Sequence, residues 1–151
     1  MNSQSGSIAT LLGALVALIV LGVVGYVVLA KGELPDGPDQ LVWDRTACAT
    51  CKMHVGEPGF AAQARLRDGR TLAFDDPGCL FELLDDIEAE VHTIWFHHRH
   101  DDRWIRADRV AFVSAEPTPM GFGIAAVDLG DADARTFEAV RREFAEKRRA
   151  R

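Results

Sequence analysis

The hydrophobic and polar positions divide the chain into two different parts. Residues 8–30, IATLLGALVALIVLGVVGYVVLA, carry no charge, and all of the charged residues (17 Lys and Arg, 23 Asp and Glu) follow this stretch. As a helix with a rise of about 1.5 Å per residue, the stretch is roughly 34 Å long, enough to cross a hydrocarbon core of about 30 Å. The pattern predicts a polar tip over residues 1–7, a single transmembrane anchor over 8–30 and a water-facing part after it.

A cleaved signal peptide is the alternative for the apolar stretch, because VLA before Lys31 could form a cleavage site. The tip MNSQSGS has no Lys or Arg, and the apolar run exceeds the usual ~7–15 residues of a signal core. Both features favour a retained anchor. Counting positive charges beside the helix leans weakly toward a cytoplasmic domain, since only Lys31 contributes.

The water-facing part begins with a Pro- and Gly-containing linker over residues 31–43 and continues as one domain over 44–151. Alternating residues at 60–66 predict a strand, and Asp68-Gly69 is a strong hairpin signal before a partner strand, TLAFDD. A helix is expected next, because Asp76 can cap it and an apolar stripe recurs at helical spacing. The stretch HTIWFHH then predicts a third strand.

The second half echoes the first in the order of its elements. RWIRADRVAFVSA predicts one or two short strands, EPTPMGFG a loop and FGIAAVDL another strand. A helix with an acidic start and a basic end is expected to begin near Asp131, an order that suits the helix dipole. The expected fold is α+β: an N-terminal transmembrane helix followed by two small ββαβ-like units, the second incomplete.

Charge and motif content exclude several classes of function. The net charge of −6 argues against nucleic-acid binding, which favours a basic face. The sequence shows no nucleophile paired with a base, no phosphate-binding loop and no H-E-x-x-H motif. We therefore expect a protein that is not an enzyme.

The stretch ACATCKMHVGEPG concentrates metal-binding residues. Cys48, Cys51 and Met53 form a C-x-x-C-x-M motif, in which two sulfurs can reach one ion. Zinc usually takes a second pair of thiolate or imidazole ligands, whereas a thioether suits the soft ion Cu(I). The motif thus favours copper. A redox dithiol, with Met53 as a packing residue, and a structural zinc module are the alternatives.

Four other positions belong to the candidate chemistry. His54 is an open candidate for a third or fourth ligand, and Met120, in a Pro/Gly loop, is open between ligand and loop anchor. Cys79 falls in the first turn of the expected helix, where a thiolate is favoured, but we interpret it first as a small buried residue. The histidines of HTIWFHHRH are interpreted as polar edge residues.

Two stretches are characteristic when taken together: CATCKMHVGEPGFAAQARLRDGRTLAFDDPGCLFELL and TPMGFGIAAVD. Over about residues 44–128 the chain resembles the NosL family of copper-binding accessory proteins linked to maturation of nitrous oxide reductase. It implies a fold of two ββαβ units and an extracytoplasmic Cu(I) site. The ligands carried over by motif are Cys48, Cys51, Met53 and Met120.

The resemblance also implies partners and a location. It implies a copper chaperone that receives copper from an upstream donor and delivers it to a cuproprotein such as nitrous oxide reductase. We expect a single-pass protein of the bacterial inner membrane with its domain on the periplasmic or extracellular side. A membrane-anchored thiol-disulfide oxidoreductase using Cys48 and Cys51 is the alternative function. Two departures are notable: familiar members are anchored by a lipidated cysteine, and here the second unit lacks its last strand.

Overall fold

The computed structural model describes residues 3–30, 34–35 and 37–151, and contacts divide the chain into one unit up to Pro35 and another from Asp36 onward. The first unit contains helix α1, Ser3–Ala30. Apolar side chains between residues 12 and 27 of α1 are exposed. In the part of the chain that the structure describes, no helix is both long and apolar enough to span a membrane.

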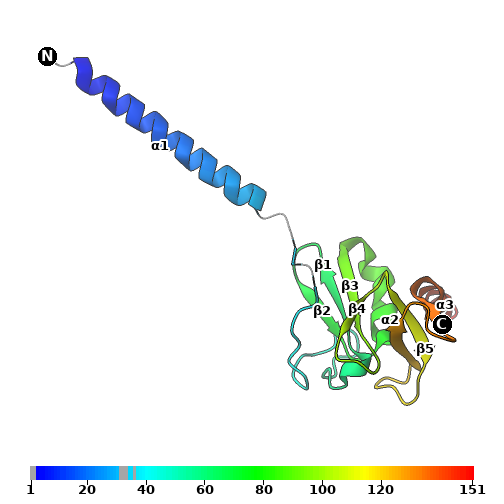
Figure 1. The fold of residues 1–151 in the computed structure, drawn as a ribbon. Helices are drawn as coiled ribbons and strands as arrows, with labels where there is room; N and C mark the ends of the chain where they lie inside the picture. Colours follow the sequence, from blue (N-terminus) through cyan, green and yellow to red (C-terminus); the bar gives the residue numbers. More distant parts are fainter. Residues whose placement is uncertain (1–2, 31–33, 36) are drawn as a thin grey trace. The chain divides into compact units, whose positions relative to one another are not determined.

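The second unit is an α+β domain, and its first half has the predicted ββαβ order (Figure 1). The elements are β1 (Ala62–Leu66), β2 (Thr71–Phe74), α2 (Pro77–Ile87) and β3 (Val91–His97). Strand β1 pairs antiparallel with both β2 and β3, and β4 (Trp104–Arg106) extends this sheet in the order β2-β1-β3-β4.

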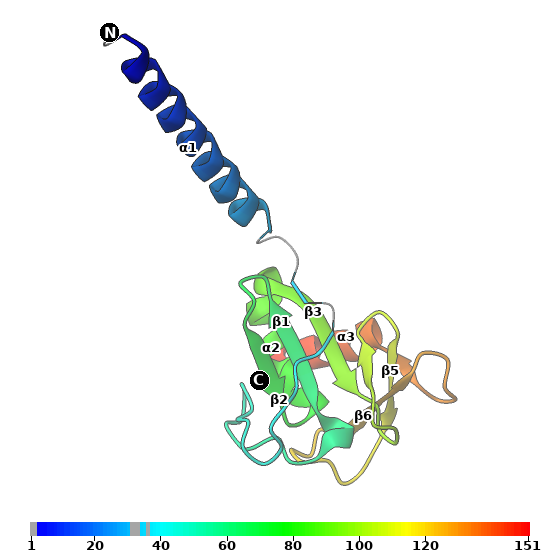
Figure 2. The same ribbon diagram turned by 60° about the vertical axis from the view of Figure 1, so that its left-hand side comes forward.

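The second half forms a smaller sheet with its own helix. Strand β5 (Val110–Ser114) lies between β6 (Ile124–Asp128) and the short β7 (Arg135–Thr136), and helix α3 (Phe137–Arg149) follows. The two small sheets are visible as separate groups of strands in Figure 2. The fold is therefore mixed α+β, with three helices and two small sheets in the described residues.

The predicted start of α3 near Asp131 is wrong, because the helix begins six residues later, at Phe137. Asp133 has a left-handed backbone (φ 60°), which interrupts a right-handed helix. Arg135 and Thr136 pair with β5 instead, and the Thr136 hydroxyl accepts from the Ala139 N–H to cap the helix. The acidic segment before Thr136 is a turn that leads into β7.

Strand β1 is buried on both faces, although its alternating sequence predicts one polar face. Ala62 and Ala64 belong to the core under α2. On the other face, the backbone of Asp39 exchanges two hydrogen bonds with the amide of Gln63, and the Asp39 carboxylate pairs with Arg65 at 2.7 Å. Residues 37–41 of the expected linker thus lie along the sheet and supply polar partners for its buried side chains.

Phenylalanine side chains hold the two halves of the domain together. The Phe81 ring of α2 contacts the rings of Phe96, Phe112, Phe137 and Phe144, with centroids 5.2–6.0 Å apart. Aromatic pairs at such separations stabilise beyond their area of burial. Because α2 is fixed from both halves, the position of its first turn is well defined.

Candidate metal centre

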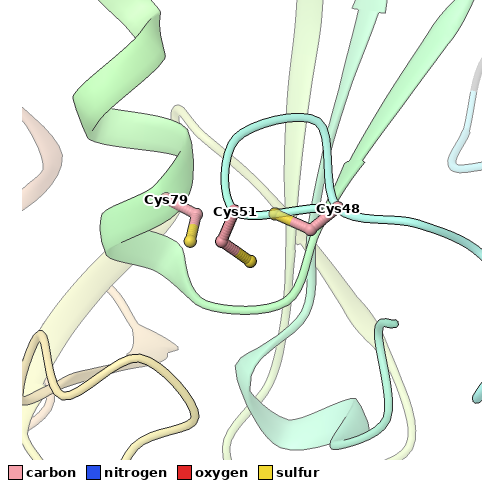
Figure 3. Close-up of side chains that lie close together, drawn as sticks. All are labelled: Cys48, Cys51 and Cys79. Carbon is pink, nitrogen blue, oxygen red and sulfur yellow. The ribbon is translucent and has the colours of Figure 1, made fainter. Parts of the chain in front are cut away.

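The C-x-x-C motif lies in a tight loop between residues 46 and 55. The ends of the loop are closed by a Cys48 N–H to Met53 carbonyl bond of 2.8 Å and an isolated bridge between Ala47 and His54. At its tip the Lys52 N–H donates to the Cys48 carbonyl, and Lys52 has a left-handed backbone (φ 68°). This turn brings the side chains of Cys48 and Cys51 to the same side of the loop (Figure 3).

Two hydrogen bonds fasten this loop to the rest of the domain. The Ala49 N–H donates to the carbonyl of Ala73 in β2 at 2.8 Å, and the Thr50 hydroxyl donates to the carbonyl of Cys79 at 2.6 Å. The second bond joins the loop directly to the first turn of α2. That turn is capped by Asp76, as predicted, and has Pro77 at its first position.

The structure brings Cys48, Cys51 and Cys79 together. Their sulfur atoms all lie within 4.8 Å of one another, and the three side chains converge between the loop and the start of α2 (Figure 3). Cys48 and Cys79 are each 1% exposed, whereas Cys51 is half-buried. Cys79 is buried, as its first interpretation predicts, but it also belongs to the cluster.

Hydrogen bonds concentrate negative charge on one sulfur. The Cys79 thiol donates to Cys48, which lowers the pKa of Cys48 well below its usual value, and backbone N–H groups of Asp75, Cys51 and Thr50 act in the same direction. The same side-chain bond, together with burial, raises the pKa of Cys79, and burial raises the pKa of Cys51. The hydrogen bonds of the cluster therefore favour the thiolate form at Cys48.

The two candidate methionines are exposed thioethers on segments that adjoin the cluster. Met53, 58% exposed, follows Cys51 by two residues on the same loop. Met120, 37% exposed, lies between β5 and β6, and its N–H donates to the carboxylate of Asp76, three residues before Cys79. Neither side chain is buried as core filler.

The histidines are placed differently from the cysteines. His54 is exposed and is not part of the three-sulfur cluster. His97 and His98 are buried at the end of β3, where His97 bonds Asp102 and His98 accepts from the N–H groups of His100 and Asp101. These bonds agree with a turn after β3, but the interpretation of His97 as an edge residue is wrong, because it is buried and pairs with Trp104 of β4.

The cluster has a donor set and spacing suited to a soft metal ion. With metal–sulfur bonds of about 2.3 Å, three sulfurs around a trigonal ion stand about 4 Å apart, so the observed spacing needs little adjustment. Among the described residues, no His, Asp or Glu joins the group as a fourth ligand. Soft thiolate and thioether ligands suit Cu(I), zinc and iron–sulfur clusters.

Comparison with known proteins yields one informative structural neighbour. The crystal structure of the copper chaperone NosL from Shewanella denitrificans matches with a TM-score of 0.53 and 20% identity, covering 75% of this chain and 89% of that one. No family model and no curated protein matches the sequence. The chain has a NosL-like fold. The fold resemblance expected from the two sequence stretches is thereby confirmed.

Within this NosL-like fold, sequence reasoning identified two of the three clustered sulfurs as candidate ligands, Cys48 and Cys51, and gave less weight to the third. The signal for Cys79 was its place in the first turn of a capped helix, where backbone N–H groups favour a thiolate. That signal could not show that the turn faces a loop 28 residues earlier in the chain. This proximity follows from the hydrogen bonds of Ala49 to Ala73 and of Thr50 to Cys79.

Proposed function

We propose that this protein is a copper chaperone that binds Cu(I) through Cys48, Cys51 and Cys79, with Met53 and Met120 as thioether ligands at the rim. The observation that carries the proposal is the convergence of three sulfurs, within 4.8 Å, in a NosL-like fold. His54 is a less favoured additional ligand, because its side chain is exposed and outside the cluster. The proposed ion is cargo, and no catalytic step is assigned to it.

The balance between burial and exposure supports transfer. The cluster has two buried sulfurs and one half-buried sulfur, Cys51, which lies on the same loop as the exposed Met53. An incoming sulfur ligand of an acceptor protein can reach the ion from this side and displace the accessible ligands first. Buried thiolates retain the ion until the new bonds form, so copper need not pass through water.

The proposed partners are an upstream copper donor and a recipient cuproprotein such as nitrous oxide reductase. We further propose that residues 8–30 anchor the chain in the bacterial inner membrane, with the domain on the extracytoplasmic side. The anchor is proposed from the charge-free apolar sequence of 23 residues alone, because no described helix meets the length and apolarity of a membrane span. The name of the structural neighbour, a copper chaperone, supports the class of cargo.

A thiol-disulfide oxidoreductase is the second candidate, because the C-x-x-C motif contains a cysteine with a lowered pKa. In such an enzyme the activated thiolate must meet a substrate disulfide. Here Cys48, the cysteine with the lowered pKa, is only 1% exposed. Cys51 is half-buried and more accessible, but its partial burial raises the pKa of its thiol. The reactive and accessible properties therefore fall on different cysteines, which favours the chaperone.

One experiment separates these two functions. Met120→Leu is a near-isosteric change that costs less than about 1.5 kcal/mol in stability. In the reduced full-length variant we expect weaker retention of Cu(I) against a chelator, because a soft ligand is lost. The oxidoreductase predicts full retention together with fast exchange of the dithiol with small disulfides, and that combined result would overturn the chaperone.

A further inference from the structure

The carboxylate of Asp76 is shared by two segments that border the cysteine cluster. Its Oδ1 atom accepts from the Gly78 N–H at 2.8 Å and caps α2, the helix that carries Cys79. Its Oδ2 atom accepts from the Met120 N–H at 3.2 Å, across 44 residues of sequence. Asp76 is 0% exposed, so both bonds are shielded from competition with water.

A second contact closes the loop between β5 and β6 onto the same helical turn. A Cβ atom added at Gly78 would lie 2.0 Å from a ring carbon of Phe122, so the ring occupies the space that any other residue would need. The loop is thus held against α2 at two points. The Met120 N–H bonds Asp76, and the Phe122 ring, two residues further along the chain, packs on Gly78. The glycine is required here by the close approach of the two segments.

The loop presents Met120 on a tight turn. The Gly121 N–H donates to the Thr118 carbonyl at 3.1 Å, which closes a four-residue turn with Pro119 in the second position and Met120 in the third. Proline and glycine at the second and fourth positions suit such a turn. The orientation of the turn relative to α2 is then set by the Asp76 bond and the Phe122 contact.

We propose that Asp76 is a positioning residue of the copper centre, which fixes Cys79 and Met120 relative to each other through one buried carboxylate. This role rests on the proposed function, because it assumes that both sulfurs bind the ion. Asp76 itself need not touch the metal. Groups that orient ligands in this way typically contribute about 10–100-fold to metal affinity.

The test uses substitutions that keep the helix cap and remove the link to Met120. In Asp76→Asn, one side-chain oxygen can still accept from Gly78, as a helix cap allows, but the amide nitrogen cannot accept from Met120. In Asp76→Ser the hydroxyl oxygen can also cap the helix, but the shorter side chain cannot reach the Met120 N–H as well. This variant replaces Asp76→Asn in the test if the asparagine variant does not fold. Thr136→Ala is the matched control, since it removes the cap of α3, away from the cluster.

Cu(I) affinity of the full-length protein is measured by chelator competition, and the sulfur ligands are counted by X-ray absorption. We expect Asp76→Asn to lower the affinity about 10–100-fold and to lose one sulfur ligand, while Thr136→Ala changes neither. The decisive step adds Met120→Leu to both backgrounds. Met120→Leu should weaken Cu(I) binding when it is made in the wild-type protein. In the Asp76→Asn variant, the same substitution should cause no further loss of affinity.

Two results would overturn this role. Equal effects of Met120→Leu in both backgrounds would show that Asp76 does not act through Met120. An unchanged number of sulfur ligands in Asp76→Asn would show that the Asp76 carboxylate serves only as a helix cap. Failure of the wild type to bind Cu(I) would instead refute the proposed function and this role with it, so the two failures are distinguishable.

Discussion

At the scale of single residues, exposure separates side chains that serve packing from those available to a ligand. Among the described residues, Met53 and Met120 are exposed large apolar side chains on segments that adjoin the cysteine cluster, in which two cysteines are buried and one is half-buried. An exposed thioether contributes little to the core, so its place in the sequence is not explained by packing. The proposed copper binding would give both side chains a chemical role.

Met53→Ala is expected to weaken Cu(I) binding without unfolding the protein. Because the side chain is 58% exposed, the change in the free energy of unfolding should stay within about 0.5 kcal/mol. Leu129→Ala is the matched control, since Leu129 is 57% exposed and is not a ligand candidate. Chelator competition and urea unfolding measure the two effects. Equal Cu(I) affinity in both variants would remove Met53 from the site.

Residue patterns predicted part of the site. The spacing of Cys48 and Cys51 indicates a shared ion without knowledge of the fold, because two intervening residues can bring both sulfurs to one side of a loop. The contribution of Cys79 depends on tertiary contacts that no local pattern encodes. For the same reason, the sequence left Met120 open between ligand and loop anchor, although its N–H bonds a buried carboxylate beside Cys79.

At the scale of elements, the strongest local signals predicted the structure best. The cap and proline at the start of α2 and the Asp68-Gly69 turn each act on backbone within a few residues, and all of them appear as expected. The start of α3 was misplaced because acidic residues suit a helix N-terminus but also suit turns. Arg135 and Thr136 pair with β5 instead of joining the helix. This tertiary contact outweighs the local helical preference of the acidic segment.

The attachment of residues 37–41 to the sheet is expected to depend on pH. Hydrogen bonds from Thr71 and Arg65 hold the pKa of Asp39 below the usual value of an aspartate side chain. The unfolded state then binds more protons, so this contribution to stability is present above about pH 4 and is lost as pH falls through the folded pKa. Because the Asp39 side chain is half exposed, the effect should be under about 1 kcal/mol.

Asp39→Asn should therefore lower stability at neutral pH and flatten its decline below about pH 4. Urea unfolding of the full chain at several pH values measures both effects. Asp133→Asn is the control, because Asp133 lies in the exposed turn before β7 and asparagine also tolerates its left-handed backbone. An acid profile of Asp39→Asn identical to that of the wild type would contradict the assigned role.

At the scale of the whole molecule, the proposed membrane anchor predicts that the domain lies on the extracytoplasmic side. In reduced cells whose outer barrier has been opened, a membrane-impermeant thiol reagent should label Cys51, the half-buried cysteine of the cluster. Cys51→Ser should abolish most of this labelling, because Cys48 and Cys79 are each 1% exposed. Labelling that appears only after lysis of the inner membrane would place the domain in the cytoplasm.

The central claim is that the three-sulfur cluster selects Cu(I), and metal competition tests it most directly. The reduced full-length protein is reconstituted without oxygen in equal amounts of Cu(I) and Zn(II), separated from free metal and analysed for both. The proposed function predicts one Cu(I) per chain and no retained zinc, with copper content reduced strongly in Cys79→Ser. Retention of zinc in preference to copper, or copper retention unaffected by Cys79→Ser, would contradict it.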